Sequence, residues 1–157
     1  MMLSDMTWMS DGGEPMTIEF LEELRSLVLR VKRDELRVNS LKSKLYSPQG
    51  LNTDVKVQSS GNESDALVDI VCDMEQTLEA ERAELDRMSR IAEESFRVLD
   101  DEHRKLMLLR YNCGFTWTEI MSTMHYSSSS IYRKRKECFM VLLGGSNGMD
   151  EVAKVMR

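Results

Sequence analysis

Two runs of apolar residues with alternating three- and four-residue spacing constrain the fold of this chain more than any other feature. Such spacing places a narrow apolar seam along one side of a helix, and the seam is buried only when another helix packs against it. Each run has one acidic residue in a seam position, Asp34 in the first and Glu81 in the second. The apolar positions are Phe20, Leu24, Leu27, Val31, Val38, Leu41 and Leu45 in the first run, and Leu67, Val71, Met74, Leu78, Leu85, Met88 and Ala92 in the second.

The two seams match each other in reverse order. Phe20 pairs with Ala92 and Leu45 with Leu67, and the residue numbers of the pairs between them add to the same value. Two antiparallel helices joined by a loop would meet layer by layer in this register. The sequence therefore predicts a long antiparallel coiled-coil hairpin over residues 17–98.

Capping and breaking residues mark the ends of the predicted helices. Thr17 is a suitable N-cap for the first helix, and Ser64 is one for the second. Residues 46–64 are polar and contain Pro48 and two glycines, so they are predicted to form the loop.

The two acidic seam residues have two interpretations. In the first, Asp34 and Glu81 lie where the seam is partly exposed and are met by Arg30, Arg37 or Arg82. In the second, they specify the register or the oligomeric state of the helices. The first is favoured, but both remain open from the sequence.

The composition indicates a protein of a reducing cytosol. Of 157 residues, 41% are hydrophobic and 31% charged, and no apolar run approaches the roughly 20 residues that cross a membrane. The N-terminus lacks the features of a signal peptide. The three cysteines are far apart and form no C-x-x-C pair, which argues against a disulfide framework or a zinc site. Residues 1–16 are expected to be a disordered extension, with Met16 an alternative start, and residues 146–157 a C-terminal tail.

Charge is unevenly distributed along the chain. Residues 63–94 have 11 acidic and 3 basic side chains, a balance of −8, whereas residues 95–143 have 5 acidic and 8 basic ones, a balance of +3. An acidic middle followed by a mildly basic part suggests two separate roles.

Residues 99–145 carry signals for three short helices. Asp100 or Asp101 can cap a helix that runs to about Asn112, and Gly114 is the expected stop after it. The buried side of this helix is predicted to consist of Leu106, Met107 and Leu109.

A capping box opens the next helix. In the stretch TWTE, residues 116–119, the Thr116 hydroxyl can accept from the backbone N–H of Glu119, whose carboxylate reaches back. This helix is expected to end near Met124, and Ser127 can cap a third helix. The third helix is predicted to bury Ile131, Cys138, Phe139 and Leu142 and to end at Gly144 and Gly145.

A short capped helix, a tight turn and a longer basic helix follow the order of a helix-turn-helix motif, whose second helix enters the DNA major groove. The alternative, a solvated serine-rich linker, is disfavoured by the capping box and the apolar periodicity. With Ile131 inward, Arg133 would read base edges, whereas Lys134 and Arg135 would flank the buried side and reach phosphates. The predicted DNA-binding residues are Ser127, Ser128, Ser129, Tyr132, Arg133, Lys134, Arg135 and Lys136.

Residues 99–142 resemble region four of bacterial sigma factors. The whole of 17–142 is similar to small phage or prophage regulators that join a helical hairpin to such a module, including the RinA and ArpU groups of late-gene activators. The sequence departs from the motif at Met121, where alanine is usual, and at His125, where glycine usually makes the turn. The matching residues are Leu109, Arg110, Tyr111, Gly114, Glu119, Ile120, Ser127 and Ile131.

No catalytic constellation is recognisable, so the protein is not expected to be an enzyme or to need a cofactor or metal. The two histidines, His103 and His125, form no metal or nucleophile motif. The patterns predict an all-α protein, and the resemblance implies a regulator that binds double-stranded DNA and acts with host RNA polymerase in the bacterial cytoplasm. Because one helix-turn-helix with so few basic residues should bind DNA weakly alone, a homodimer formed through the hairpin is expected. Two alternatives are a DNA-packaging protein of the small terminase type and a polymerase-binding module with little DNA binding of its own.

Overall fold

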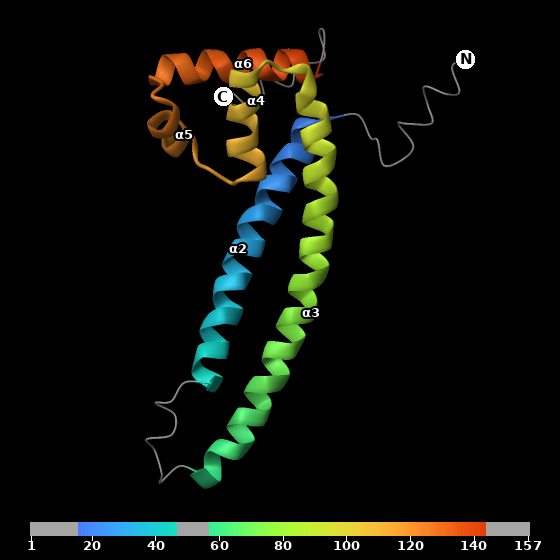
Figure 1. The fold of residues 1–157 in the computed structure, drawn as a ribbon, viewed down its shortest axis with the longest axis vertical. Coiled ribbons are helices and arrows are strands. Elements are labelled where there is room, and N and C mark those ends of the chain that lie inside the picture. Colours follow the sequence, from blue (N-terminus) through green and yellow to red (C-terminus); the bar gives the residue numbers. More distant parts are fainter. Residues whose placement is uncertain (1–15, 47–56, 144–157) are drawn as a thin grey trace, which may run out of the picture. The chain divides into compact units, whose positions relative to one another are not determined.

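A computed structural model describes residues 16–46 and 57–143, with side chains for residues 16–46 and 65–143. The described part of the chain consists of helices and the short connections between them, with no strand, which confirms the all-α class (Figure 1). Within it, no helix is both long enough and apolar enough to span a membrane. The elements are α2 (Ile18–Tyr46), α3 (Val57–Ser95), the 3-10 turn η3 (Phe96–Val98), α4 (Asp101–Met107), the π-type turn η4 (Leu108–Asn112), α5 (Trp117–Met124) and α6 (Ser128–Leu143).

The chain divides into two compact units. The helical-pair unit contains the described residues between 29 and 85, and the C-terminal unit contains residues 16–28 and 86–143. α2 and α3 each contribute to both units.

Ion pairs link α2 and α3 within the helical-pair unit. Arg30 and Glu35 of α2 pair with residues 81 and 82 of α3, and Lys42, further along α2, pairs with the earlier residue 75, so the two helices run antiparallel there. Salt bridges on exposed helix surfaces contribute little stability, so the buried side chains between the helices dominate. The pairs are Arg30–Glu81 at 2.9 Å, Glu35–Arg82 at 2.7 Å and Lys42–Glu75, and the buried apolar residues are Val31, Val38, Val71 and Leu78.

The acidic seam residues are half-buried, and each has an arginine neighbour. Glu81 accepts from Arg30, one of the expected partners, whereas Asp34 lies 3.7 Å from the adjacent Arg33. The second carboxylate oxygen of Glu81, Oε1, is buried with no hydrogen-bond partner among the described residues. This arrangement favours the first interpretation, a tolerated acid compensated by arginine.

The helix ends agree only partly with the predictions. Thr17 caps α2, because its hydroxyl accepts from the Phe20 N–H at 3.0 Å. The prediction for α3 was wrong: the helix begins at Val57, so the last part of the predicted 46–64 loop is helical and Ser64 is not its N-cap. Gly61 was expected to interrupt the helix, but one glycine inside a helix lowers its stability by only about 1 kcal/mol. The predictions for residues 1–15, 47–56 and 144–157, including the glycine stop after α6, lie outside the described residues.

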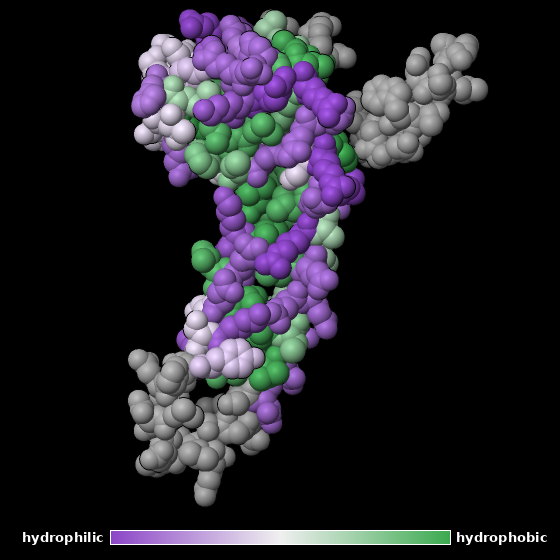
Figure 2. Space-filling view, viewed as in Figure 1, coloured by the Kyte–Doolittle hydropathy of each residue, from purple (hydrophilic) through white to green (hydrophobic). Residues whose placement is uncertain are grey.

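The core of the C-terminal unit is formed by α4, η4, α5 and α6. Tyr111 and Phe139 are fully buried, with ring centroids 6.5 Å apart in a tilted arrangement. Burial raises the pKa of the Tyr111 hydroxyl, so the ring is a neutral core residue at any physiological pH. The other buried residues of α4, α5 and α6 are Leu106, Met107, Ile120, Ile131 and Cys138. In Figure 2 the visible surface of α6 is mostly hydrophilic.

We predict that Leu24→Ala lowers the free energy of unfolding by about 2–5 kcal/mol, because it leaves a cavity where the wild-type side chain is fully buried. Leu36→Ala is the matched control on the same helix, since Leu36 is 72% exposed and its loss should cost little. Urea unfolding followed by circular dichroism measures both. Equal losses for the two variants would contradict the burial pattern of α2.

Candidate nucleic-acid interface

α4 and the turn η4 that continues it begin and end where the sequence predicts. The Asp100 carboxylate caps α4 by accepting from the His103 N–H at 2.9 Å. The helical path continues through η4 to Asn112, and Gly114 follows in the left-handed conformation with φ 82°. Single π-type turns are often found near functional sites.

α5 is positioned by a complete capping box. The Thr116 hydroxyl accepts from the Glu119 N–H at 3.1 Å, and the Glu119 carboxylate accepts from the Thr116 N–H at 2.8 Å. At the other end of α5, His125 adopts a left-handed conformation with φ 59° and ψ 47°. Histidine therefore makes the turn for which the sequence resemblance would favour glycine, and the two helices on either side are separated by only a few residues.

α6 is capped by Ser127, whose hydroxyl accepts from the Ser130 N–H at 3.2 Å. Ile131, Cys138 and Phe139 are buried as expected, whereas Leu142 is only half-buried. Burial raises the pKa of the Cys138 thiol to about 12, and its Sγ donates to the His103 carbonyl 3.8 Å away. Cys138 is therefore an inert core residue.

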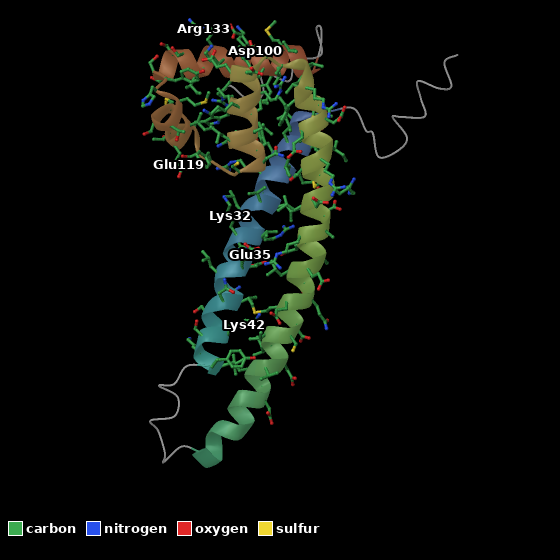
Figure 3. All side chains as sticks on the ribbon, viewed as in Figure 1. Lys32, Glu35, Lys42, Asp100, Glu119 and Arg133 are labelled. Atoms are coloured by element: carbon green, nitrogen blue, oxygen red, sulfur yellow. The ribbon has the colours of Figure 1, made fainter. Side chains whose placement is uncertain are left out.

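The outward residues of α6 form a surface that we call the exposed stripe. Tyr132 is 50% exposed although it is a large aromatic residue, and Arg133 lies on the outer side of the helix (Figure 3). The exposed stripe has two basic residues and no acidic one. Its members, all exposed as predicted, are Ser128, Ser129, Tyr132, Arg133 and Lys136.

Lys134 lies differently from what the sequence suggested. Its ammonium is 3.2 Å from the Glu102 carboxylate of α4 and 5.5 Å from the centre of the Tyr126 ring, and its side chain is only 17% exposed. The Tyr126 hydroxyl also donates to Glu102, and this hydrogen bond lowers the pKa of the Glu102 carboxyl. The charge of Lys134 is thus engaged in attaching α6 to α4, which leaves less of it for a phosphate.

Arg135 also points into the unit rather than outward. Its guanidinium carbon lies 4.1 Å from the centre of the Trp117 ring, and that of Arg110 lies 4.6 Å from the same ring. A cation stacked on indole at this distance is favourable. Arg110 was expected only as part of a motif, and Trp117 was assigned no role; no local sequence signal links this tryptophan to arginines 7 and 18 residues away.

His103 bridges α4 and α6, a role that the sequence did not indicate. Its Nδ1 lies 2.7 Å from the Asp100 carboxylate and its Nε2 lies 2.8 Å from that of Glu137. Burial alone would lower the pKa of the ring, but the two carboxylates outweigh burial and raise it, although the Lys134 charge opposes them. Protonated His103 therefore joins the two helices most strongly.

The described residues contain no group of three or more histidine, cysteine, aspartate or glutamate side chains that could hold a metal ion. The C-terminal unit is a helical module with an exposed basic helix. Comparison with known families matches residues 32–142 to the family described as "Protein of unknown function (DUF722)", and the chain belongs to that family. No curated protein matches the chain, and no solved structure matches it.

We predict that Ser127→Ala lowers stability by about 1 kcal/mol, because the α6 cap is lost. Ser128→Ala is the matched control: Ser128 is exposed inside the first turn, where alanine is the better helix former, so stability should stay equal or rise slightly. Thermal unfolding of the two variants compares them. An equal loss in both would show that Ser127 does not act as the cap.

We also predict that His103 makes stability pH-dependent. Because its folded pKa lies above the unfolded value of about 6.5, its contribution is complete below that pH and is lost as pH rises through the folded pKa. The melting temperature of wild type should therefore fall from pH 6 to pH 8 relative to that of His103→Gln. His125→Gln, which changes an exposed histidine, should keep the wild-type slope. Parallel pH profiles for wild type and His103→Gln would contradict the bridge.

Proposed function

We propose that this protein is a sequence-specific, double-stranded-DNA-binding transcriptional regulator of phage or prophage origin, acting with RNA polymerase in the bacterial cytoplasm. In this proposal α4, η4, α5 and α6 form a helix-turn-helix domain like region four of sigma factors. α2 and α3 form the antiparallel hairpin that precedes it, and α6 is the recognition helix.

The exposed stripe on α6 is the observation that carries this proposal. Ser128 and Ser129 lie in the first turn, where small side chains allow close approach and the unpaired N–H groups and helix dipole favour a phosphate. Tyr132, Arg133 and Lys136 continue the stripe along the next turns. Recognition helices use such residues of their N-terminal half to contact base edges in the major groove.

The distribution of charge around α6 also supports DNA binding. Glu137, the one acidic residue of α6, is engaged by His103, and Glu102 of α4 is engaged by Lys134. Both acids therefore have a partner on the facing helix, although the Glu137 side chain stays 48% exposed, whereas Arg133 and Lys136 are exposed with no acidic partner among the described residues. Unpaired basic side chains on the outer side are what a phosphate backbone attracts.

The small number of exposed basic side chains favours a dimer. One recognition helix with two exposed cations makes few phosphate contacts, and affinity increases with the number of phosphates neutralised. Dimerisation through the hairpin would present two recognition helices to half-sites one helical turn, or a multiple of it, apart.

We predict that Arg133→Ala weakens binding to the preferred sequence by about 1–3 kcal/mol and relaxes selection at one base position, because the guanidinium fork matches the two acceptors of guanine. The preferred duplex is first selected from a random pool with wild-type protein. Binding of wild type and Arg133→Ala to this duplex and to a scrambled duplex is then measured. Arg37→Ala is the control, since it removes an equal charge from an exposed position of α2.

The outcome separates the alternatives. An unchanged selected-to-scrambled ratio in Arg133→Ala would show that another side of α6 faces DNA. Absence of wild-type binding at low salt would favour the polymerase-binding module. A ring of many subunits in sedimentation would favour the small terminase type of protein.

A further inference from the structure

Three arginines from three different elements converge on the loop that precedes α5. Arg25 of α2 donates from Nη2 to the Gly114 carbonyl at 3.3 Å, and Arg110 of η4 donates from Nη1 to the adjacent Phe115 carbonyl at 3.1 Å. Arg135 of α6 reaches the same place by stacking on Trp117, as Arg110 does. We call Arg25, Arg110 and Arg135 the arginine cluster.

The donors of the arginine cluster are only partly used. The Nε atoms of all three arginines are buried, and none has a hydrogen-bond partner among the described residues. None of the three guanidiniums forms an ion pair within the described part of the chain either. Buried donors without acceptors are rare in folded proteins, and each requires an explanation.

The arginine cluster also has excess positive charge. The charge of Glu22 acts on both Arg110 and Arg135, and this carboxylate already accepts from the Tyr111 hydroxyl at 3.4 Å. The three guanidiniums of the cluster thus share the negative charge of Glu22. Burial, followed by the charge of Arg25, lowers the pKa of Arg110, and burial followed by Arg110 lowers that of Arg135, as expected for cations that repel one another. An anion beside the guanidiniums would offset this repulsion.

The arginine cluster borders the exposed stripe. Ser128, Tyr132 and Arg135 are spaced four and three residues apart, so they follow one line along α6, about 10 Å from first to last. Glu137 is exposed beside Arg133 and Lys136, but the line of Ser128, Tyr132 and Arg135 carries no acidic residue, so a polyanion on that line would reach the arginine cluster.

We propose that Arg25, Arg110 and Arg135 form a phosphate-binding site, and that the phosphate is one of the backbone groups of the DNA that α6 contacts. The source of the phosphate rests on the proposed function. Arginine forks match the oxygens of a phosphate in paired hydrogen bonds, and stacking on Trp117 fixes the planes of two of the three forks. The site would set the position of the recognition helix on the duplex without reading its sequence.

The first arm of the test measures the salt dependence of binding to a duplex selected with wild-type protein. Arg25→Gln and Arg135→Gln should each flatten the slope of log Kd against log salt by about 0.9, the value for one lost phosphate contact. The double variant should flatten it no further, since both arginines hold the same phosphate. Arg37→Gln, the matched loss of charge on α2, should keep the wild-type slope.

The second arm measures melting temperature in inorganic phosphate against chloride at equal ionic strength. Phosphate should raise the melting temperature of wild type and Arg37→Gln, but not that of Arg25→Gln. Arg25→Lys keeps the charge and should retain part of the shift, which separates anion binding from a loss of folding.

The two arms distinguish the site from the proposed function. If wild type binds no duplex but inorganic phosphate stabilises it through Arg25, the phosphate site stands and DNA binding fails. If wild type binds DNA and the cluster variants behave like Arg37→Gln in both arms, DNA binding stands and the phosphate site is overturned. If the double variant loses twice the slope of either single variant, the arginines hold separate phosphates and the shared site is wrong.

Discussion

The packing of α6 against α4 and η4 decides which side of α6 is available to a partner. Phe139 and Cys138 are fully buried, and the Phe139 ring meets that of Tyr111. Once these side chains are inside, helical geometry places residues 129, 133 and 136 on the opposite side, whereas Ser128 and Tyr132 lie at the exposed border of the packed side. The exposed stripe is therefore a consequence of the core and needs no separate cause.

Polar contacts at the borders of this core divide the rest of α6 into two edges. On the first edge, Lys134 binds Glu102 and Glu137 binds His103, so positive and negative charges offset each other. On the second edge, Arg135 meets Arg110 and Trp117, where positive charge accumulates. The first edge therefore holds α6 against α4, and the second edge is suited to binding an anion.

The proposed division of labour follows the two compact units. The helical-pair unit has the compensated Glu81 and a narrow apolar seam, which suit it to helix association. The C-terminal unit has the capped short helices and the exposed basic stripe. Membership of the family described as "Protein of unknown function (DUF722)" covers residues from both units, so both parts are features of that family's sequence.

Local signals in the sequence determined the helix limits of the C-terminal unit, because caps and stops act within three or four residues. Asp100, Thr116, Ser127 and Gly114 are all found in the predicted conformations or hydrogen bonds. Periodicity likewise determined that Ile131 would be buried and Arg133 exposed. The start of α3 was missed because Gly61 weakens a helix by less than its neighbours can support.

Only the tertiary structure decided the partners of the long polar side chains. Lys134 and Arg135 are adjacent in sequence and equally basic, yet one meets Glu102 and the other Trp117. His103 meets Glu137, 34 residues away, and Arg25 meets the carbonyl of Gly114, 89 residues away. A flexible side chain can reach many positions around its helix, and the choice among them depends on which distant elements the core brings near, which no local pattern records.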